Sequence, residues 1–248
     1  MTFQVLTKNF KLNQTKEQAF NTDTILLANF IKVPKVCKNI LDIGTGSGVL
    51  MLDLAFKTNA NIFGVEIQEK RFIQAKENIM LNDLSERLKV YNKDLKEFNN
   101  KILFDMIVSN PPFFKVNNNQ RLSENLEDLI ARHEVSLTLE DLVSNVSRLL
   151  KYRGTFYLVH RPDRLEEIIY LFNKYNIVLK TIRFVHPYLE SRANHVLIKG
   201  IKNGNLGLDV LNPLIIYKEK HEFTEEMKEI IGDFWCKKVL EMIKKLYT

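Results

Sequence analysis

Short apolar runs alternate with longer segments of helical periodicity along most of this 248-residue chain. The runs lie at 39–44, 61–66, 88–94, 102–109 and 155–160, and each has the length and composition of a buried strand. Parallel strands need crossover connections, which are usually helices, and most of the intervals here are long enough to form one. The alternation therefore predicts βαβ units on a largely parallel sheet.

Apolar spacing and capping residues predict the helices. Residues 47–57 and 69–81 each follow a strand and carry apolar side chains at helical spacing. Thr138, with Asp141 three residues on, has the pattern of a capping box at the start of a third helix. We expect Gly154 to end that helix, because glycine commonly terminates helices.

The C-terminal third predicts a different kind of connection. Pro162 suits the first turn of a helix. The runs at 177–185 and 194–201 then follow with no helix-length segment between them, so we expect them to pair antiparallel. A last helix is expected from about Thr224. The fold class predicted is α/β and Rossmann-like, with a seven-stranded, mostly parallel sheet, an antiparallel last strand and a C-terminal helix.

Length and composition favour a single domain with a substantial core. No run approaches the ~18 apolar residues that a membrane span needs, and the opening residues lack the apolar region of a signal peptide. Cys37 and Cys236 are the only cysteines and have no CxxC spacing, and the five histidines show no HxxxH pairing. The cysteine and histidine spacing predicts neither a disulfide nor a metal site, and favours the reducing cytoplasm. We also expect a monomer without membrane association.

Positive charge is concentrated in one part of the chain. The net charge is +6, yet residues 145–204 carry 11 Lys and Arg against 4 Asp and Glu, while 1–144 are balanced and 205–248 carry 7 against 8. Such a stretch fits either a polyanionic partner or a solvated surface that aids solubility, and charge alone leaves both open. The candidates for phosphate contact in this stretch are Arg148, Lys151, Arg153, Arg161, Arg164, Arg183 and Arg192.

A glycine-rich turn joins the first predicted strand to its helix. Gly44, Gly46 and Gly48 permit a tight turn and a close approach of the backbone to a ligand. Glu66 ends the next strand, 22 residues beyond Gly44, where a carboxylate can accept both hydroxyls of a ribose. Dinucleotide-binding enzymes have a similar layout, but their third glycine would fall on Val49. The GxGxG form favours a methyltransferase over a nicotinamide enzyme or a purely structural turn.

Two aspartates are expected near the same crevice. In a doubly wound sheet the carboxyl ends of the strands converge on one ligand site. Asp42 lies near the end of the first strand and Asp94 just after the third. Asp94 can accept a hydrogen bond from the adenine amine of a nucleoside cofactor, and its alternative role is that of a turn or helix-capping residue.

The segment Asn110-Pro111-Pro112-Phe113 directly follows the fourth strand. An aromatic amine is a poor nucleophile, because its lone pair is delocalised into the ring. The Asn110 side-chain oxygen and the Pro111 carbonyl can accept its two hydrogens, while the prolines hold these acceptors in place and Phe113 stacks on the base. An ordinary turn is the alternative. The position in a cofactor crevice favours methyl transfer to an amine.

The motifs LDIGTGSG, VEIQ, NKDL and SNPPFF resemble those of class I amino-methyltransferases in sequence and order. The segments QAFNTDTILLANF, ARHE, LTLEDL, VHRPDRL, RFVHP and ANHVLIKGIKNG further resemble the bacterial tRNA adenine-N6 methyltransferase family, which modifies adenosine 37 of a valine tRNA. The resemblance covers roughly residues 14–217. It divides the single domain into a lead-in region (1–38), a catalytic core (39–217) and a helical extension (218–248).

The resemblance implies roles for particular residues. It implies S-adenosylmethionine as the cofactor and tRNA as the partner, and makes Arg132 of the ARHE segment a further candidate for RNA contact. Thr22 and Asp23 would lie near the methionine end of the cofactor. The target amine would be held by Asn110, Pro111, Pro112 and Phe113, and the cofactor by Asp42, Gly44, Gly46, Gly48, Glu66, Asp94 and Asn110.

Other methyl acceptors and other protein classes are the alternatives to this function. The same motif serves protein glutamine, rRNA guanine and DNA adenine. Glutamine enzymes carry a helical domain ahead of the glycine turn, whereas about 40 residues precede it here, and a DNA-recognition domain does not fit this length. A non-catalytic RNA-binding module would be expected to have lost Asn110 or the glycines, and both are intact.

Overall fold

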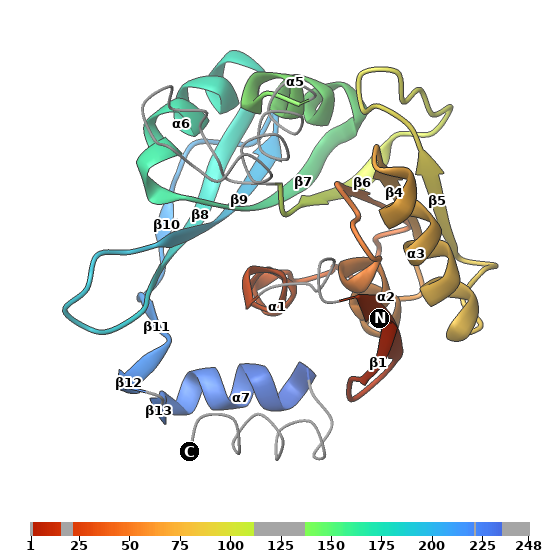
Figure 1. Ribbon diagram of the computed structural model, residues 1–248. Coiled ribbons are helices and arrows are strands. Elements are labelled where there is room, and N and C mark those ends of the chain that lie inside the picture. Colours follow the sequence, from red (N-terminus) through yellow and green to blue (C-terminus); the bar gives the residue numbers. More distant parts are fainter. Residues whose placement is uncertain (1, 16–21, 112–136, 221, 235–248) are drawn as a thin grey trace, which may run out of the picture.

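The computed structural model describes residues 2–15, 22–111, 137–220 and 222–234 (Figure 1). Its main sheet has nine strands in the order β10-β8-β9-β7-β6-β3-β4-β5, and β11 also pairs with β8. The strands are β3 (Asn39–Ile43), β4 (Asn61–Glu66), β5 (Leu88–Asn92), β6 (Phe104–Ser109), β7 (Leu150–His160), β8 (Ile177–His186), β9 (His195–Lys202), β10 (Asp209–Val210) and β11 (Leu214–Ile215).

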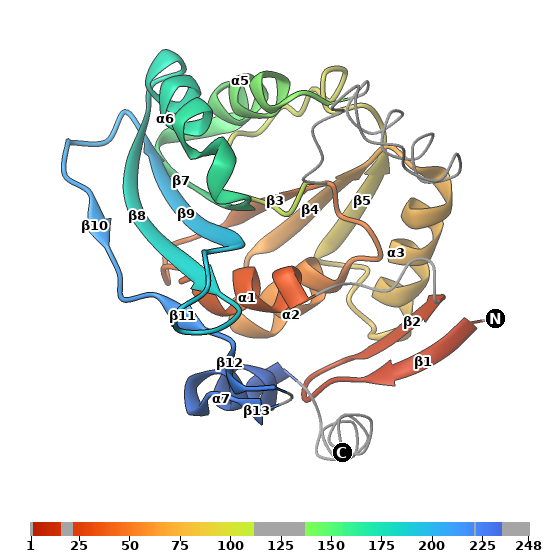
Figure 2. The same cartoon turned by 60° about the vertical axis from the view of Figure 1, so that its left-hand side comes forward.

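The topology confirms the predicted sheet. β5, β4, β3, β6 and β7 are parallel neighbours, and β9 runs antiparallel between β7 and β8. Figure 2 shows β3, β4 and β5 side by side. Beyond the seven predicted strands, the two-residue strands β10 and β11 pair with the outer edge of β8, where they cover part of its backbone.

Helices cover both faces of the sheet, as Figure 1 shows. They are α1 (Thr22–Phe30), α2 (Val49–Lys57), α3 (Glu69–Leu81), α5 (Leu139–Leu149), a short 3₁₀ turn η2 (Pro162–Arg164), α6 (Leu165–Lys174) and α7 (Glu225–Phe234). Side chains of α1, α2 and α7 form one core cluster with the sheet, and those of α5 and α6 form a second on the opposite face. Among the described residues no helix is long and apolar enough to cross a membrane.

The start of α5 was predicted correctly and its end was not. Thr138 Oγ1 accepts from Asp141 N at 3.0 Å, and Asp141 Oδ2 accepts from Thr138 N at 3.1 Å, which completes the capping box. However, α5 ends at Leu149, and Gly154 lies inside β7. The pairing of β7 with β6 is irregular there, and a Cβ at Gly154 would lie 2.9 Å from the Lys151 carbonyl oxygen. The glycine therefore permits a tight bulge rather than ending a helix.

The N-terminal region contains a hairpin as well as a helix. β1 (Thr2–Leu6) pairs antiparallel with β2 (Lys11–Thr15), and β2 packs against α3 (Figure 2). A second small hairpin, β12 (Tyr217–Glu219) with β13 (Glu222–Phe223), precedes α7. The contact with β2 makes the buried face of α3 partly polar, because Asn78 and Gln74 point inward. Of the apolar residues at helical spacing, Ile73 and Met80 are exposed instead.

Candidate active site

Four neighbouring parallel strands end on the same side of the sheet, and a residue predicted to be functional lies at or just after the end of each. Ile43 of β3 lies beside Val65 of β4 and Ser109 of β6, and Glu66 of β4 lies beside Asn92 of β5. The four predicted residues therefore lie in the spatial order Asp94, Glu66, Gly44, Asn110 along this side of the sheet. This confirms that the parallel sheet brings the sequence motifs to one place.

The glycine turn has the open geometry that a bound ligand requires. Gly44, Gly46 and Gly48 have φ angles of +73°, +59° and +85°, which L side chains rarely adopt. A Cβ added at Gly44 would meet nothing within 4 Å, so the space in front of this residue is free of other described atoms. Gly48 instead packs against Ala75 of α3, where a Cβ would lie at 3.4 Å. The first glycine therefore leaves open space beside the turn, and the third permits close packing against α3.

Glu66 is buried, with 5% of its surface exposed, and both of its carboxylate oxygens accept backbone hydrogen bonds. Oε2 accepts from Gly46 N at 2.8 Å, and Oε1 accepts from Gln68 N at 2.9 Å. These bonds fix the carboxylate against the glycine turn, a role that the sequence pattern did not reveal. Each oxygen keeps a further lone pair, so the same carboxylate can also accept from two hydroxyl groups.

Asp42 is a buried carboxyl group beside the same turn. Its burial, and secondarily the charge of Glu66, raise its pKa to about 8, while a hydrogen bond with Thr45 opposes the shift. Its Oδ2 atom is buried without a hydrogen-bond partner among the described residues. A buried carboxyl group in this condition binds a proton at neutral pH or accepts a cationic ligand.

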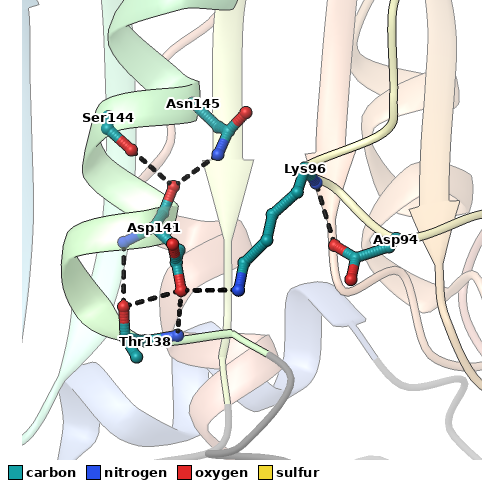
Figure 3. Close-up of polar contacts among 6 residues, drawn as sticks. All are labelled: Asp94, Lys96, Thr138, Asp141, Ser144 and Asn145. Carbon is teal, nitrogen blue, oxygen red and sulfur yellow. Dashed lines mark hydrogen bonds and ion pairs between the residues drawn. The ribbon is translucent and has the colours of Figure 1, made fainter.

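Asp94 holds the turn that follows β5 (Figure 3). Its Oδ1 accepts from Lys96 N at 2.9 Å, which is the turn-capping role that the sequence left open. The ammonium group of Lys96 lies 3.0 Å from Asp141 Oδ2, so this turn is tied to the capping box of α5. A carboxylate has about four acceptor positions, so the capping bond leaves Asp94 able to accept from a ligand amine.

Asn110 follows β6 directly and is oriented by a neighbouring helix. Its Nδ2 donates to Thr24 Oγ1 of α1 at 2.9 Å, so Oδ1 is its remaining polar atom and acts as an acceptor. Pro111 beside it is partly buried. Pro112 and Phe113 lie outside the described residues, so the second half of the motif stays a prediction.

The first turn of α1 lies against β9. Asp23 is buried, and its Oδ1 lies 3.2 Å from Nε2 of His195. Burial raises the pKa of Asp23 and lowers that of His195, while the attraction between the two groups opposes both shifts. Thr22 is exposed at the start of the helix. Asp23 directly precedes Thr24, whose hydroxyl accepts a hydrogen bond from Asn110.

The basic candidates do not form one surface. Arg161 follows β7 at the same edge as Asn110, and Arg192 lies in the β8–β9 connection that leads to His195. Arg148, Lys151 and Arg153 lie at the opposite end of the sheet, where β7 begins, and Lys151 forms an ion pair with Asp105 at 2.7 Å.

Two further candidates are held by acidic side chains. Arg164 contacts Glu167 at 2.7 Å, and Arg183 donates to both carboxylate oxygens of Glu226 at 2.7 and 2.8 Å. Arg132 lies outside the described residues. Charge patterning along the sequence could not separate these groups, because it does not record which end of a strand a residue occupies.

Several supporting residues were missed by sequence reasoning. Asn78 of α3 is fully buried, and its Nδ2 donates to the carbonyls of Ser47 and Asn13 at 2.9 and 3.0 Å, which ties the glycine turn to β2. Gly64 of β4 lies directly under Thr45, and a Cβ there would overlap the threonine hydroxyl. An asparagine on the inward face of an amphipathic helix was the available signal for Asn78, since buried polar groups need partners.

The strand order, the glycine turn and the acidic residue at the end of β4 together define a class I methyltransferase. The chain belongs to the methyltransferase small domain family, whose model matches residues 16–185.

A curated relative, the tRNA1(Val) (adenine(37)-N6)-methyltransferase of Phocaeicola vulgatus, is 31% identical over 218 residues, or 86% of this chain and 89% of that protein. Among solved structures, a predicted O-methyltransferase from Agrobacterium tumefaciens has a TM-score of 0.67 at 21% identity, covering 86% of this chain and 96% of that one. A geranyl diphosphate C-methyltransferase from Streptomyces coelicolor A3(2), solved with S-adenosyl-L-homocysteine, has a TM-score of 0.53 at 12% identity and covers 72% and 79% of the two chains.

S-adenosylmethionine is the cofactor of this methyltransferase domain, and the residues at the edge fit it. The open space at Gly44 leaves room for the ligand beside the turn. The unpartnered Oδ2 of Asp42 suits a ligand that carries positive charge, and the Glu66 carboxylate suits ribose hydroxyls.

Proposed function

We propose that this protein methylates the exocyclic amine of an adenine in tRNA, specifically adenosine 37 of a valine tRNA. The observation that carries the proposal is the orientation of Asn110, whose amide nitrogen donates to Thr24 and whose amide oxygen has no hydrogen-bond partner among the described residues. The name of the Phocaeicola vulgatus relative supplies the specific tRNA and position. Because its substrate would be tRNA, we place the protein in the cytoplasm.

Asn110 and Pro111 act on the substrate amine. Asn110 Oδ1 and the Pro111 carbonyl accept hydrogen bonds from the two hydrogens of the amine. These two bonds draw the nitrogen toward tetrahedral geometry and direct its lone pair toward the methyl donor. The bound cofactor supplies an electrophilic methyl group on a sulfonium. The nitrogen–carbon bond forms as the carbon–sulfur bond breaks, and the methylated ammonium then loses a proton to water. Most of the acceleration comes from positioning, which contributes up to ~7–11 kcal/mol where alignment is good.

The remaining site residues bind and orient. Glu66 accepts from the ribose hydroxyls and Asp94 from the adenine amine of the cofactor. Asp42, Thr22 and Asp23 serve its methionine end, beside the backbone of Gly44, Gly46 and Gly48. Pro112 and Phe113 complete the acceptor loop, with Phe113 stacking on the target base. We assign the catalytic core to 39–217, flanked by 1–38 and 218–248, with α1 of the flanking region contributing to the site.

Arg161 and Arg192 are the basic candidates that we place against the RNA backbone. Both are exposed, and both lie at the edge of the sheet that carries Asn110. An unpaired base of an anticodon loop is the least costly to extrude into such a pocket. Phosphate contacts then offset the remaining cost of extrusion.

Nucleoside mass spectrometry tests the proposal. Unmodified valine tRNA is incubated with the protein and isotopically labelled cofactor, alongside a transcript in which adenosine 37 is replaced by guanosine and the variant Asn110→Ala. We expect labelled N6-methyladenosine only with the unaltered tRNA and the unaltered protein. Labelled methylguanosine, or label on a glutamine-containing peptide instead of the tRNA, would contradict the assignment.

A further inference from the structure

We propose that Thr24 is a positioning residue that holds the Asn110 side chain with its amide oxygen toward the substrate. An asparagine side chain has a donor end and an acceptor end of almost equal size, so only its hydrogen bonds decide its orientation. Amine activation needs the oxygen end, because the amine presents hydrogens. This inference rests on the proposed activity and adds a residue to it.

The hydrogen bond to Thr24 is the contact that holds Asn110 at the site, with the threonine hydroxyl as the acceptor. Asn110 Nδ2 donates to Thr24 Oγ1 at 2.9 Å, which commits the nitrogen end to the helix and turns Oδ1 away from it. The hydroxyl group is 86 residues away along the chain and is buried, with 8% of its residue exposed. Because Thr24 is buried, water competes little for this hydrogen bond, which helps to hold the Asn110 side chain in place.

Helix α1 is anchored firmly enough to act as the support. Near its start, Asp23 lies 3.2 Å from His195 of β9. Near its end, Lys57 Nζ donates to the Ala28 carbonyl at 2.6 Å, and the Tyr157 hydroxyl donates to the Lys32 carbonyl at 3.2 Å. These contacts hold α1 to α2, β7 and β9, so Thr24 keeps a fixed position relative to the strand that ends at Ser109.

The test compares two substitutions of Thr24. Thr24→Val keeps the shape and removes the acceptor, whereas Thr24→Ser keeps the hydroxyl. We expect Thr24→Val to lower the single-turnover rate of methyl transfer by on the order of tenfold or more, the effect of removing one hydrogen bond at the reacting group. Its affinity for S-adenosylmethionine and its KM for tRNA should stay within about threefold of wild type, and Thr24→Ser should restore the rate.

A second readout does not depend on activity. The side-chain amide resonances of Asn110 are assigned by their disappearance in Asn110→Ala and followed by NMR in the protein without substrate. Thr24→Val should move these resonances toward those of a solvent-exposed asparagine, and Thr24→Ser should not. Wild-type rates and unshifted resonances in Thr24→Val would overturn the inference, as would a slower rate explained by weaker cofactor binding or a lowered melting temperature.

Different results would contradict the proposed function and the proposed role of Thr24. If the wild-type protein methylates no adenine in tRNA, the proposed function is wrong. The Thr24 comparison is then made on the amine or amide that the protein does methylate, since any acceptor presenting hydrogens to Asn110 needs the same orientation.

Discussion

The Ser109 hydroxyl donates to the Ile43 carbonyl at 2.9 Å, and this bond joins the ends of β6 and β3. Ser109 is completely buried, so the bond is shielded from water. The two residues that follow, Asn110 and Gly44, are thereby held side by side although they are 66 positions apart. In the proposed function, Asn110 carries the acceptor for the substrate amine, and Gly44 begins the glycine turn that faces the cofactor.

Glu66→Ala should weaken the binding of S-adenosylmethionine by about 1.5–3 kcal/mol, the contribution of hydrogen bonds to a charged group. The effect has two sources, since Glu66 contacts the ligand in our assignment and also fixes Gly46 N. Isothermal titration calorimetry measures it. Glu86→Ala, an exposed carboxylate beyond α3 and before β5, is the matched control and should bind normally. Equal affinity in both variants would remove Glu66 from the cofactor site.

Asn110→Ala should reduce the single-turnover rate on the order of 10²-fold or more while the dissociation constant of the cofactor changes little. The amide oxygen acts mainly as the amine changes geometry, so its removal affects the chemical step. Rapid-quench kinetics with labelled cofactor measures the rate, and calorimetry measures binding. A variant with wild-type single-turnover kinetics would show that this loop is only structural.

Asp42→Asn should remove a pH-dependent loss of stability. The folded-state pKa of Asp42 is about 8, raised by burial and by Glu66 from 3.8, so the folded protein binds a proton that the unfolded chain has released between these values. Stability is therefore fully present below about pH 4 and falls as pH rises toward 8. Asp42→Asn lacks this titration, so its melting temperature should rise relative to wild type as pH increases from 5 to 8. Parallel melting curves across that range would refute the assigned shift.

Charge reversal at the two opposite ends of strand β7 should have different effects on tRNA binding. Arg161→Glu combined with Arg192→Glu should weaken binding and flatten the dependence of log affinity on log salt by about one unit for each phosphate that is no longer neutralised. Arg153→Glu, an exposed arginine at the opposite edge, carries the same change of charge per residue and should leave the slope unaltered. Fluorescence anisotropy with labelled tRNA over a salt series distinguishes them. Similar slopes for both variants would place the RNA elsewhere.

The helices and strands that are encoded by a local sequence pattern were predicted from the sequence. Strands with continuous apolar runs, the capping box at Thr138 and the hairpin of 177–185 with 194–201 each depend on residues close in sequence. The false helix end at Gly154 shows the limit of such patterns. A glycine that ends a helix and a glycine that permits a bulge look alike until the neighbouring strand is in place.

The sequence by itself determined the α/β class, the glycine turn, the acidic residue at the end of β4 and the position of Asn110 directly after β6, because each is encoded by residue type and short spacing. Only the tertiary structure decided what surrounds them. The bond from Asn110 to Thr24 joins residues 86 positions apart, and the partition of the basic residues depends on which end of a strand each one occupies. Such relations arise from packing and sheet order, which bring together side chains that share no local pattern along the chain.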